Sequence, residues 1–163
     1  MWQLTGRWVD TKIDRPRWRF NLQYRATPRL SLQMEFNPAV QEFFPGANWT
    51  VLIETDHQPL VNFGTSSDRI FTPEGNRAYF VTIAKTIPGT RVAPYVGMSY
   101  SEFEKGFLFP AGANIQLSEN WTVMPMFDGV NGHFLATYSG ADWNLTGMLL
   151  QGKRFGLSFG FAF

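Results

Sequence analysis

Residues 155–163, at the C-terminal end of the chain, read FGLSFGFAF. Phe and Leu occupy the odd-numbered positions, and only Gly, Ser and Ala occupy the even-numbered ones. Because side chains along a β-strand point alternately to the two faces of a sheet, this spacing is typical of a strand. The stretch therefore predicts a strand with one strongly apolar face and one face of very small residues.

The same alternation recurs throughout the chain. Residues 18–25 (WRFNLQYR) and 30–37 (LSLQMEFN) alternate apolar side chains with polar or charged ones. The ten Pro and fifteen Gly are spread so evenly that no helix of useful length fits between them. We expect up to about twelve strands, or ten or eight if the segments near 60 and 78, apolar on both faces, are not strands. The other segments begin near residues 2, 48, 60, 78, 92, 107, 121, 133 and 143.

The segments between the expected strands alternate in length. This predicts an up-and-down meander with tight turns at one end and longer loops at the other. Its two free edges favour closure into a barrel. No linker or change in composition divides residues 1–163, so we expect a single domain. Short turns are expected near residues 26–28, 56–58, 88–90, 119–120 and 140–142, and longer links at 11–16, 39–47, 67–76, 102–106, 129–132 and 152–154.

The polar face of the predicted strands indicates which side of the barrel is apolar. A three-residue turn at 26–28 would place Arg19 opposite Glu35, and such a match suits a confined lumen better than an exposed surface. Trp49 after a long link, and Trp121 and Trp143 after short turns, would give both rims an aromatic belt. Strands of about nine residues can cross an apolar band of roughly 25 Å. The pattern favours an all-β, closed antiparallel transmembrane barrel with its apolar face outward.

Composition narrows the function further. Charged residues make up 17% of the chain and aromatic residues another 17%, an unusual balance for a soluble domain. The net charge of +1 argues against nucleic acid as a partner. The chain contains no cysteine, which excludes disulfides, a thiolate metal site and a Cys nucleophile. No apolar run of eighteen residues is present, so no transmembrane helix is predicted.

The final strand, which ends in Phe163, resembles the closing strand of bacterial outer-membrane β-barrel proteins. The resemblance implies an even number of strands, with both termini on the same side and residues 2–10 paired with the last strand. It also implies a place in the bacterial outer membrane and contact with membrane lipid. In that superfamily a C-terminal Phe is the signal for the barrel-assembly machinery, which makes this machinery an expected partner.

Few residues are suited to catalysis. The chain has two histidines, and His57 lies in an expected turn. His133 and Asp128 are expected to face the lumen from adjacent strands, where the carboxylate can orient the imidazole. Ser139 would share that face, away from lipid, at a spacing that matches no catalytic motif. We therefore expect no enzyme, no catalytic residue, no metal site and no cofactor.

The charges on the inner face are the best candidates for function. They could form a paired network that plugs the barrel, or a pore lining that selects solutes by charge. Twelve strands enclose a wider space than eight, and residues 67–76 are the best candidate for a partial constriction. The candidate pore-lining residues are Arg7, Arg19, Arg25, Glu35, Glu54, Asp128 and His133.

These features predict a small porin-like pore for passive diffusion of small solutes or ions. Three alternatives stay open at this stage. The first is a non-conducting structural or anchoring barrel, which could be the membrane domain of a longer protein. The second is a soluble barrel that binds a hydrophobic ligand, and the third is a membrane enzyme. Conductance separates the pore from the anchoring barrel, and solubility without detergent identifies the soluble one.

Overall fold

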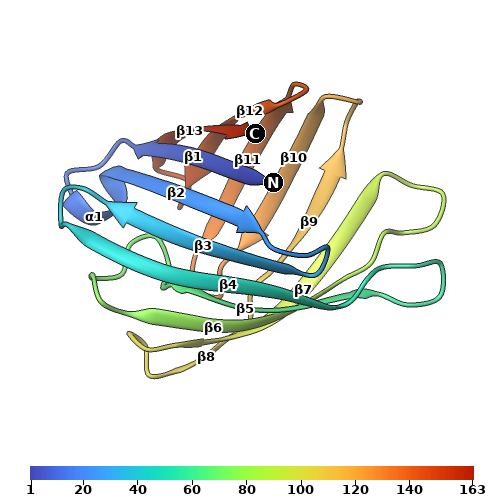
Figure 1. Cartoon of the computed structure of the whole chain (residues 1–163), viewed down its shortest axis with the longest axis horizontal. Coiled ribbons are helices and arrows are strands. Elements are labelled where there is room, and N and C mark those ends of the chain that lie inside the picture. The colour runs from blue at the N-terminus through green and yellow to red at the C-terminus, as the bar shows by residue number, and fades with distance from the viewer.

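The computed structural model describes residues 1–163, and its strands form one antiparallel sheet (Figure 1). The only helix, α1 (Asp14–Arg17), joins the first two strands, and no helix is long and apolar enough to cross a membrane. The strands are β1 (Trp2–Val9), β2 (Trp18–Arg25), β3 (Leu30–Asn37), β4 (Glu42–Leu52), β5 (Leu60–Ser67), β6 (Arg77–Ala84), β7 (Val92–Ser101), β8 (Gly106–Leu108), β9 (Ala111–Gln116), β10 (Trp121–Phe127), β11 (Gly132–Ser139), β12 (Trp143–Leu150) and β13 (Arg154–Ala162).

The sheet closes into a barrel. Consecutive strands pair with each other, except β8 and β9, and β1 pairs with β13 over seven residue pairs from Gln3↔Ala162 to Val9↔Gly156. The short β8 and the following β9 both pair with β7, one after the other along its length, so together they fill one position in the wall. The thirteen strands thus form a closed antiparallel barrel of twelve, which confirms the predicted fold class.

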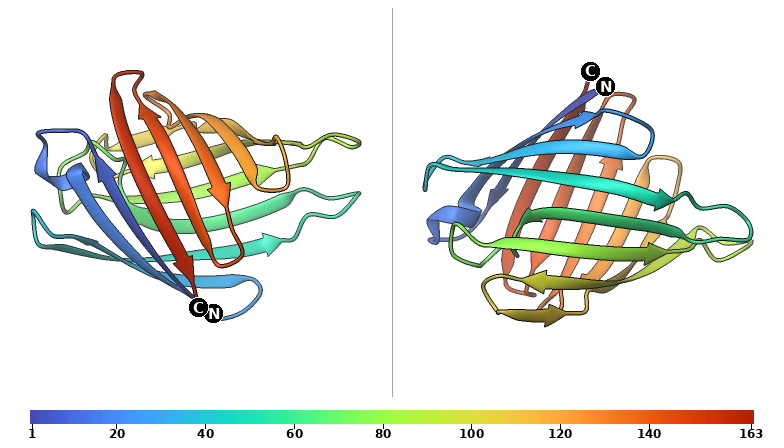
Figure 2. Two further views of the ribbon diagram at one scale, coloured as in Figure 1. Left: turned by 90° about the horizontal axis from the view of Figure 1, so that it is seen from above. Right: turned by 60° about the horizontal axis from the view of Figure 1, so that its bottom comes forward.

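Both termini lie at the same end of the barrel, which we call the terminal rim (Figure 2). The backbone N–H of Trp2 donates to the carbonyl of Phe163 at 2.8 Å, and the N–H of Phe163 donates to the carbonyl of Trp2 at 3.0 Å. The ladder between the first and last strands is therefore hydrogen-bonded up to the chain ends. The other end, formed by the connections that begin after β1, β3, β5, β7, β10 and β12, is the opposite rim.

The predicted contrast between tight turns and long loops is wrong. At the terminal rim, residues 53–59 and 85–91 form longer hairpin connections that extend beyond the barrel wall (Figure 2). At the opposite rim, β3 and β4 are joined by residues 38–41 alone. There β4 begins at Glu42, six residues earlier than expected, because a turn with Gln41 at a φ of 50° returns the chain at once.

The register of β2 and β3 also differs from the prediction. Asn21, not Arg19, lies directly opposite Glu35. The paired residues Arg25 and Ser31 enclose five residues, 26–30, and within them the N–H of Ala26 donates to the carbonyl of Leu30 at 3.0 Å. Two more residues than in the expected turn shift the cross-strand partner by two positions and leave Arg19 and Glu35 on the same face. Turn geometry of this kind is poorly specified by alternation.

The outer face of the wall is apolar from rim to rim. The outward positions of the strands carry exposed aliphatic and aromatic side chains, and charged residues do not occur among them between the rims. Such an exposed apolar belt is far larger than the surface of a water-soluble monomer tolerates. Its members include Leu4, Phe20, Leu22, Leu32, Met34, Phe63, Val96, Phe134, Leu145, Leu157 and Phe159.

Aromatic side chains gather where this belt ends. At the terminal rim, the Tyr138 ring lies 5.3 Å from Trp121 and 5.5 Å from Trp143. Trp49 is at the same rim, since it pairs with Leu30 at the start of β3, and not at the other rim as expected. The opposite rim has its own pair, Trp8 facing Trp18 across β1 and β2. Both rims therefore carry Trp, as predicted, although with different residues.

The two segments with apolar residues on both faces are the strands β5 and β6. On the inner face Phe80 lies opposite Gly64. A Cβ on Gly64 would come within 2.5 Å of the Phe80 ring, so the glycine leaves room for an aromatic side chain inside the barrel. The inner wall of β5 to β7 is accordingly less polar than that of β1 to β3.

Candidate functional site: the barrel interior

The inner face of β1 to β3 forms a polar wall. Arg7 on β1 lies directly opposite Arg19 on β2, two like charges in one cross-strand pair. Such a pair is unfavourable unless other charges compensate it. Apart from Val9 and Arg25 near the rims, the remaining inward positions are amides, hydroxyls and one carboxylate, namely Gln3, Thr5, Asn21, Gln23, Ser31, Gln33, Glu35 and Asn37.

Glu35 compensates one of these two arginines. Its side chain is fully buried, and its Oε1 lies 2.9 Å from Nη2 of Arg19. The Ser67 hydroxyl donates to the other carboxylate oxygen, Oε2. The expected pairing of Arg19 with Glu35 is thus present, although it runs diagonally between the strands.

Arg7 has no such partner. No carboxylate lies within 4.0 Å of its guanidinium, and its buried Nε has no hydrogen-bond acceptor. The charged groups that act on it are Arg19, Glu35 and Arg15, of which only Glu35 is negative. The interior therefore holds an uncompensated positive charge beside β1.

Residues 68–76, which join β5 to β6, reach across the barrel interior. Ile70 and Phe71 pack against the buried cluster of Val9, Met148 and Leu150 on β1 and β12, strands on the other side of the barrel. The Arg154 guanidinium lies 4.9 Å from the centroid of the Phe71 ring, a cation–π contact. These contacts narrow the opposite rim.

Arg15 of α1 holds the narrowing segment in place. Its Nη1 donates to the carbonyls of Arg69 at 3.1 Å and Thr72 at 2.9 Å, and its Nε lies 3.0 Å from Oε2 of Glu42. Arg15 itself is 5% exposed. Because its donors satisfy buried carbonyls, the short helix and the segment 68–76 form one packed unit inside the barrel.

Asp128 and His133 lie side by side at the opposite rim, as the sequence predicted. Oδ2 of Asp128 is 3.0 Å from Nε2 of His133, and the N–H of Gln151 donates to Nδ1 at 3.3 Å. In the neutral ring Nε2 therefore carries the proton. Burial raises the pKa of Asp128, but the bonds from His133 and from two backbone N–H groups outweigh it, so its pKa lies below the ordinary value.

The geometry gives this pair no nucleophile. Ser139 is six residues from His133 along the same strand, which corresponds to about 20 Å. No group of three or more His, Asp or Glu side chains is arranged to hold a metal ion. The contact of Asp128 with His133 is a hydrogen bond that closes the connection between β10 and β11.

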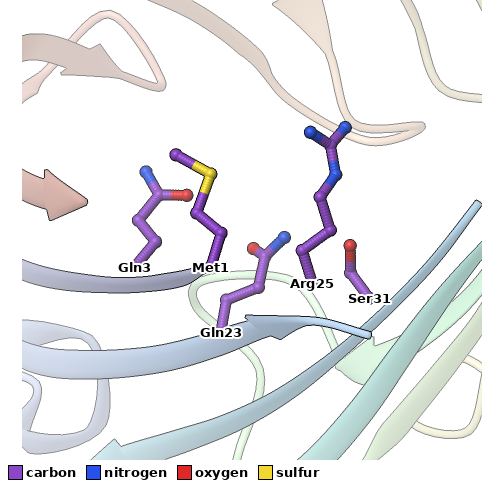
Figure 3. Close-up of a pocket in the computed structure, with 5 residues that line it drawn as sticks. All are labelled: Met1, Gln3, Gln23, Arg25 and Ser31. Atoms are coloured by element: carbon purple, nitrogen blue, oxygen red, sulfur yellow. The ribbon is translucent and has the colours of Figure 1, made fainter. Parts of the chain in front are cut away.

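Arg25 lies at the terminal rim. It lines a cavity of about 240 Å³ with Met1, Gln3, Gln23 and Ser31, whose side chains project from neighbouring strands to the same side (Figure 3). The interior is thus lined by polar groups at this end as well.

Glu54 is not part of the wall. It lies in the connection 53–59, where the N–H of Thr86 donates to its carboxylate at 2.7 Å and Lys85 lies 3.9 Å away. These contacts join the two hairpins that extend from the terminal rim. The hydrogen bond from the Thr86 N–H lowers the pKa of Glu54, and with the Thr86 hydroxyl and the Lys85 charge it outweighs the opposing effect of desolvation.

Sequence reasoning missed several interior residues. Arg15 and Glu42 were placed in expected links, and Arg69 in the link 67–76, which was expected only to constrict the lumen. Their partners come from segments 27 to 57 residues away in the chain, and alternation carries no information on such contacts. The only available signal for an interior role was the position of Arg15 beside Pro16, in a link with a single aliphatic residue, Ile13. This signal is weak.

Comparison with known proteins agrees with this architecture. No family model matches the chain, and no curated protein matches it in sequence. Among solved structures, the NanC porin matches with a TM-score of 0.62 at 12% identity, over 100% of this chain and 99% of that one. The KdgM porin in complex with disordered oligogalacturonate matches with a TM-score of 0.65 at 9% identity, over 99% and 98%. The chain therefore has the fold of the small twelve-stranded outer-membrane porins.

Proposed function

We propose that this protein is a pore of the bacterial outer membrane through which small solutes diffuse, with anions favoured over cations. The observation that carries the proposal is the contrast between the two faces of one barrel. The outer face is an uninterrupted apolar belt with aromatic rims, which suits lipid. The inner face is polar and contains the unpaired cation Arg7.

The charges of the interior give the direction of selectivity. Arg19 is neutralised by Glu35 and Arg15 by Glu42, whereas Arg7 is not neutralised. Arg25 adds a second cation without an ion pair at the terminal rim. Fixed positive charge along a narrow passage attracts anions and repels cations. Oligogalacturonate, the ligand of the KdgM porin complex, is itself a polyanion, which is consistent with this direction.

Reversal potentials in planar bilayers test the proposal. With a salt gradient across a bilayer that contains the folded protein, we expect discrete conductance steps and a reversal potential on the anion-selective side. Arg7→Gln should lower the anion preference about tenfold, the lower end of what a focused field supplies. Lys153→Gln is the matched control, since Lys153 is an exposed cation of a rim connection. Absence of any conductance would refute the proposal.

One observation supports a second candidate, a barrel that anchors or stabilises without conducting. The segment 68–76 crosses the interior and packs through Ile70 and Phe71 on the other wall. If this contact seals the passage, the same bilayer experiment gives no conductance steps although the protein inserts into the bilayer. The cavities at both rims, each lined in part by arginine, favour the pore.

Assembly is proposed to depend on the last strand. β13 ends the barrel seam, and Phe163 follows it with an exposed side chain stacked 6.2 Å from Phe161. We expect the barrel-assembly machinery to bind this end. Phe163→Ala should slow insertion of the full chain into outer-membrane vesicles that contain the machinery, and leave folding into detergent unchanged. An equal effect in both settings would assign Phe163 to folding alone.

A further inference from the structure

A second cavity lies inside the opposite rim, and its two sides differ in chemistry. Its volume is about 240 Å³. One side presents the guanidinium groups of Arg7 and Arg19 from β1 and β2. The other presents the apolar side chains of Met126, Leu135 and Met148 from β10, β11 and β12. Ile70 of the narrowing segment closes it from one end.

The polar atoms around this cavity are unequally satisfied. Asp68 is fully engaged, with Oδ2 bonded to the Ser101 hydroxyl at 2.5 Å and Oδ1 to the Arg69 N–H at 2.7 Å. Asp128 is bonded to His133 at 3.0 Å. Both carboxylates at the cavity are therefore occupied by donors of the protein itself.

Among the residues that line the cavity, the side-chain atoms that are buried and unsatisfied belong to two arginines. Nε of Arg7 and Nε of Arg69 are buried and have no acceptor. Arg7 also lacks any ion pair, whereas Arg69 is paired with Glu104. Because buried donors without acceptors cost free energy, the site is built to receive an anionic acceptor.

The apolar side restricts which anion fits. A highly hydroxylated anion would leave its hydroxyl groups against methionine and leucine without partners, which is unfavourable. A flat ring or short alkyl group suits thioether and aliphatic side chains. The cavity is smaller than the 300–1,000 Å³ of ordinary drug-sized pockets, so the ligand is a small one.

We propose that this cavity is a binding site for small amphipathic carboxylates, such as a single-ring aromatic acid, with the carboxylate on Arg7 and the ring against Met126 and Met148. The proposal deepens the anion-pore function and rests on it for its physiological meaning. The binding step itself does not require conductance. The site lies where residues 68–76 narrow the passage, so a bound ligand occupies the constriction.

Binding to the detergent-folded full chain tests the proposal, with titration calorimetry as the readout. The probes are benzoate, benzyl alcohol as its uncharged analogue, and gluconate as an anion without an apolar face. We expect benzoate to bind at least about tenfold more tightly than either, a difference of about 1.4 kcal/mol. Equal binding of benzoate and gluconate, or of benzoate and benzyl alcohol, would overturn the proposal even if every variant failed to fold.

Two variants separate the two sides of the cavity. Arg7→Gln should weaken benzoate about tenfold, and Met126→Gln, of similar size, should weaken benzoate by a similar factor while leaving gluconate unchanged. Lys153→Gln should leave both unchanged. A Met126→Gln variant that binds benzoate like the wild type would overturn the assignment of the ring to this wall.

Bilayer recordings distinguish the failure of this proposal from that of the pore function. Anion-selective conductance without preferential benzoate binding would support the pore function and refute the binding site. Preferential benzoate binding without conductance would support the binding site and refute the pore function. When both hold, benzoate should reduce the chloride current through the wild type, and this block should be lost in Met126→Gln.

Discussion

Glu35 is the residue on which the polar wall depends most. It is fully buried, accepts from Arg19 and Ser67, and is the only carboxylate that β1 to β3 direct inward. Removing one partner of a buried ion pair leaves the other charge uncompensated, and this is more costly than replacing both. The wall therefore tolerates loss of the pair better than loss of its anion.

Glu35→Gln is expected to lower the free energy of unfolding by about 3 kcal/mol. Arg19→Gln combined with Glu35→Gln should cost less than the sum of the two single changes, because the pair is lost only once. Urea unfolding in lipid vesicles, followed by tryptophan fluorescence, measures all three. Strict additivity would show that the 2.9 Å contact does not contribute to stability.

Asp128 gives the opposite rim a dependence on pH. Its pKa is lower in the folded protein than in the unfolded chain, where it is about 3.9. Its contribution to stability is therefore complete above the unfolded pKa and is lost as the pH falls through the folded pKa. The difference in unfolding free energy between wild type and Asp128→Asn should be constant from pH 6 to 5 and shrink below pH 4. A difference that grows toward acid pH would contradict this assignment.

At the scale of single residues, the sequence predicted contacts within a hairpin and missed those across the barrel. Asp128 begins the four-residue connection 128–131 and His133 follows that connection in β11, so a tight antiparallel hairpin brings them together. Arg15 contacts Thr72, which is 57 residues further along the chain. Both residues lie in connections between strands, and the alternation within strands gives no information on contacts of this kind. Glu54 was placed in the lumen because the extent of its strand was misjudged by two residues.

Among the elements, the segment 68–76 reaches across the interior, and we expect it to set the width of the passage. It is held by Phe71 against Arg154 and by Ile70 against the cluster around Met148. Ile70→Ser combined with Phe71→Ala should remove its contacts with β12 and β13 and raise single-channel conductance about twofold or more, while Arg15 still holds its backbone. Phe103→Ala, in the neighbouring connection 102–105, is the control. Unchanged conductance in the first variant would place the narrowest point elsewhere.

The strands β5 and β6 depend on a single small residue. A Cβ on Gly64 would approach Asn48 Oδ1 to 2.4 Å and the Phe80 ring to 2.5 Å. Gly64→Ala should therefore destabilise the barrel by about 1–3 kcal/mol, the usual cost of overpacking. Combining it with Phe80→Leu should recover part of that loss, as measured by the midpoint of thermal unfolding in detergent. A neutral Gly64→Ala would show that Phe80 does not fill this space.

Strand positions were predictable from alternation, whereas their ends were not. The period of two identified β2, β3, β12 and β13 to within a residue, because both faces of each are chemically distinct. It failed at β4, where Phe44, Pro45 and Gly46 interrupt the pattern although the backbone continues in the ladder. The ends of strands depend on turns, and one turn residue more or less moves the whole register.

For the whole molecule, the decisive feature is which face of the barrel is apolar. The outer face is an exposed apolar belt that runs from Leu4 around to Phe159. The interior contains the charged side chains of Arg7, Arg19 and Glu35. A barrel with its apolar face outward is not stable in water without lipid or detergent. The same alternation with the faces exchanged would give a soluble ligand-binding barrel. The orientation was predicted from charge pairing and Trp placement, and the structure has both features.

Folding with and without amphiphile tests this orientation most directly. The urea-unfolded chain is diluted into plain buffer and into detergent micelles, and β-sheet circular dichroism and gel migration before and after boiling are compared. We predict a sheet signal and a heat-sensitive shift in migration only in detergent. A monomer that folds to the same sheet content in plain buffer would contradict the outward apolar belt, and with it the pore.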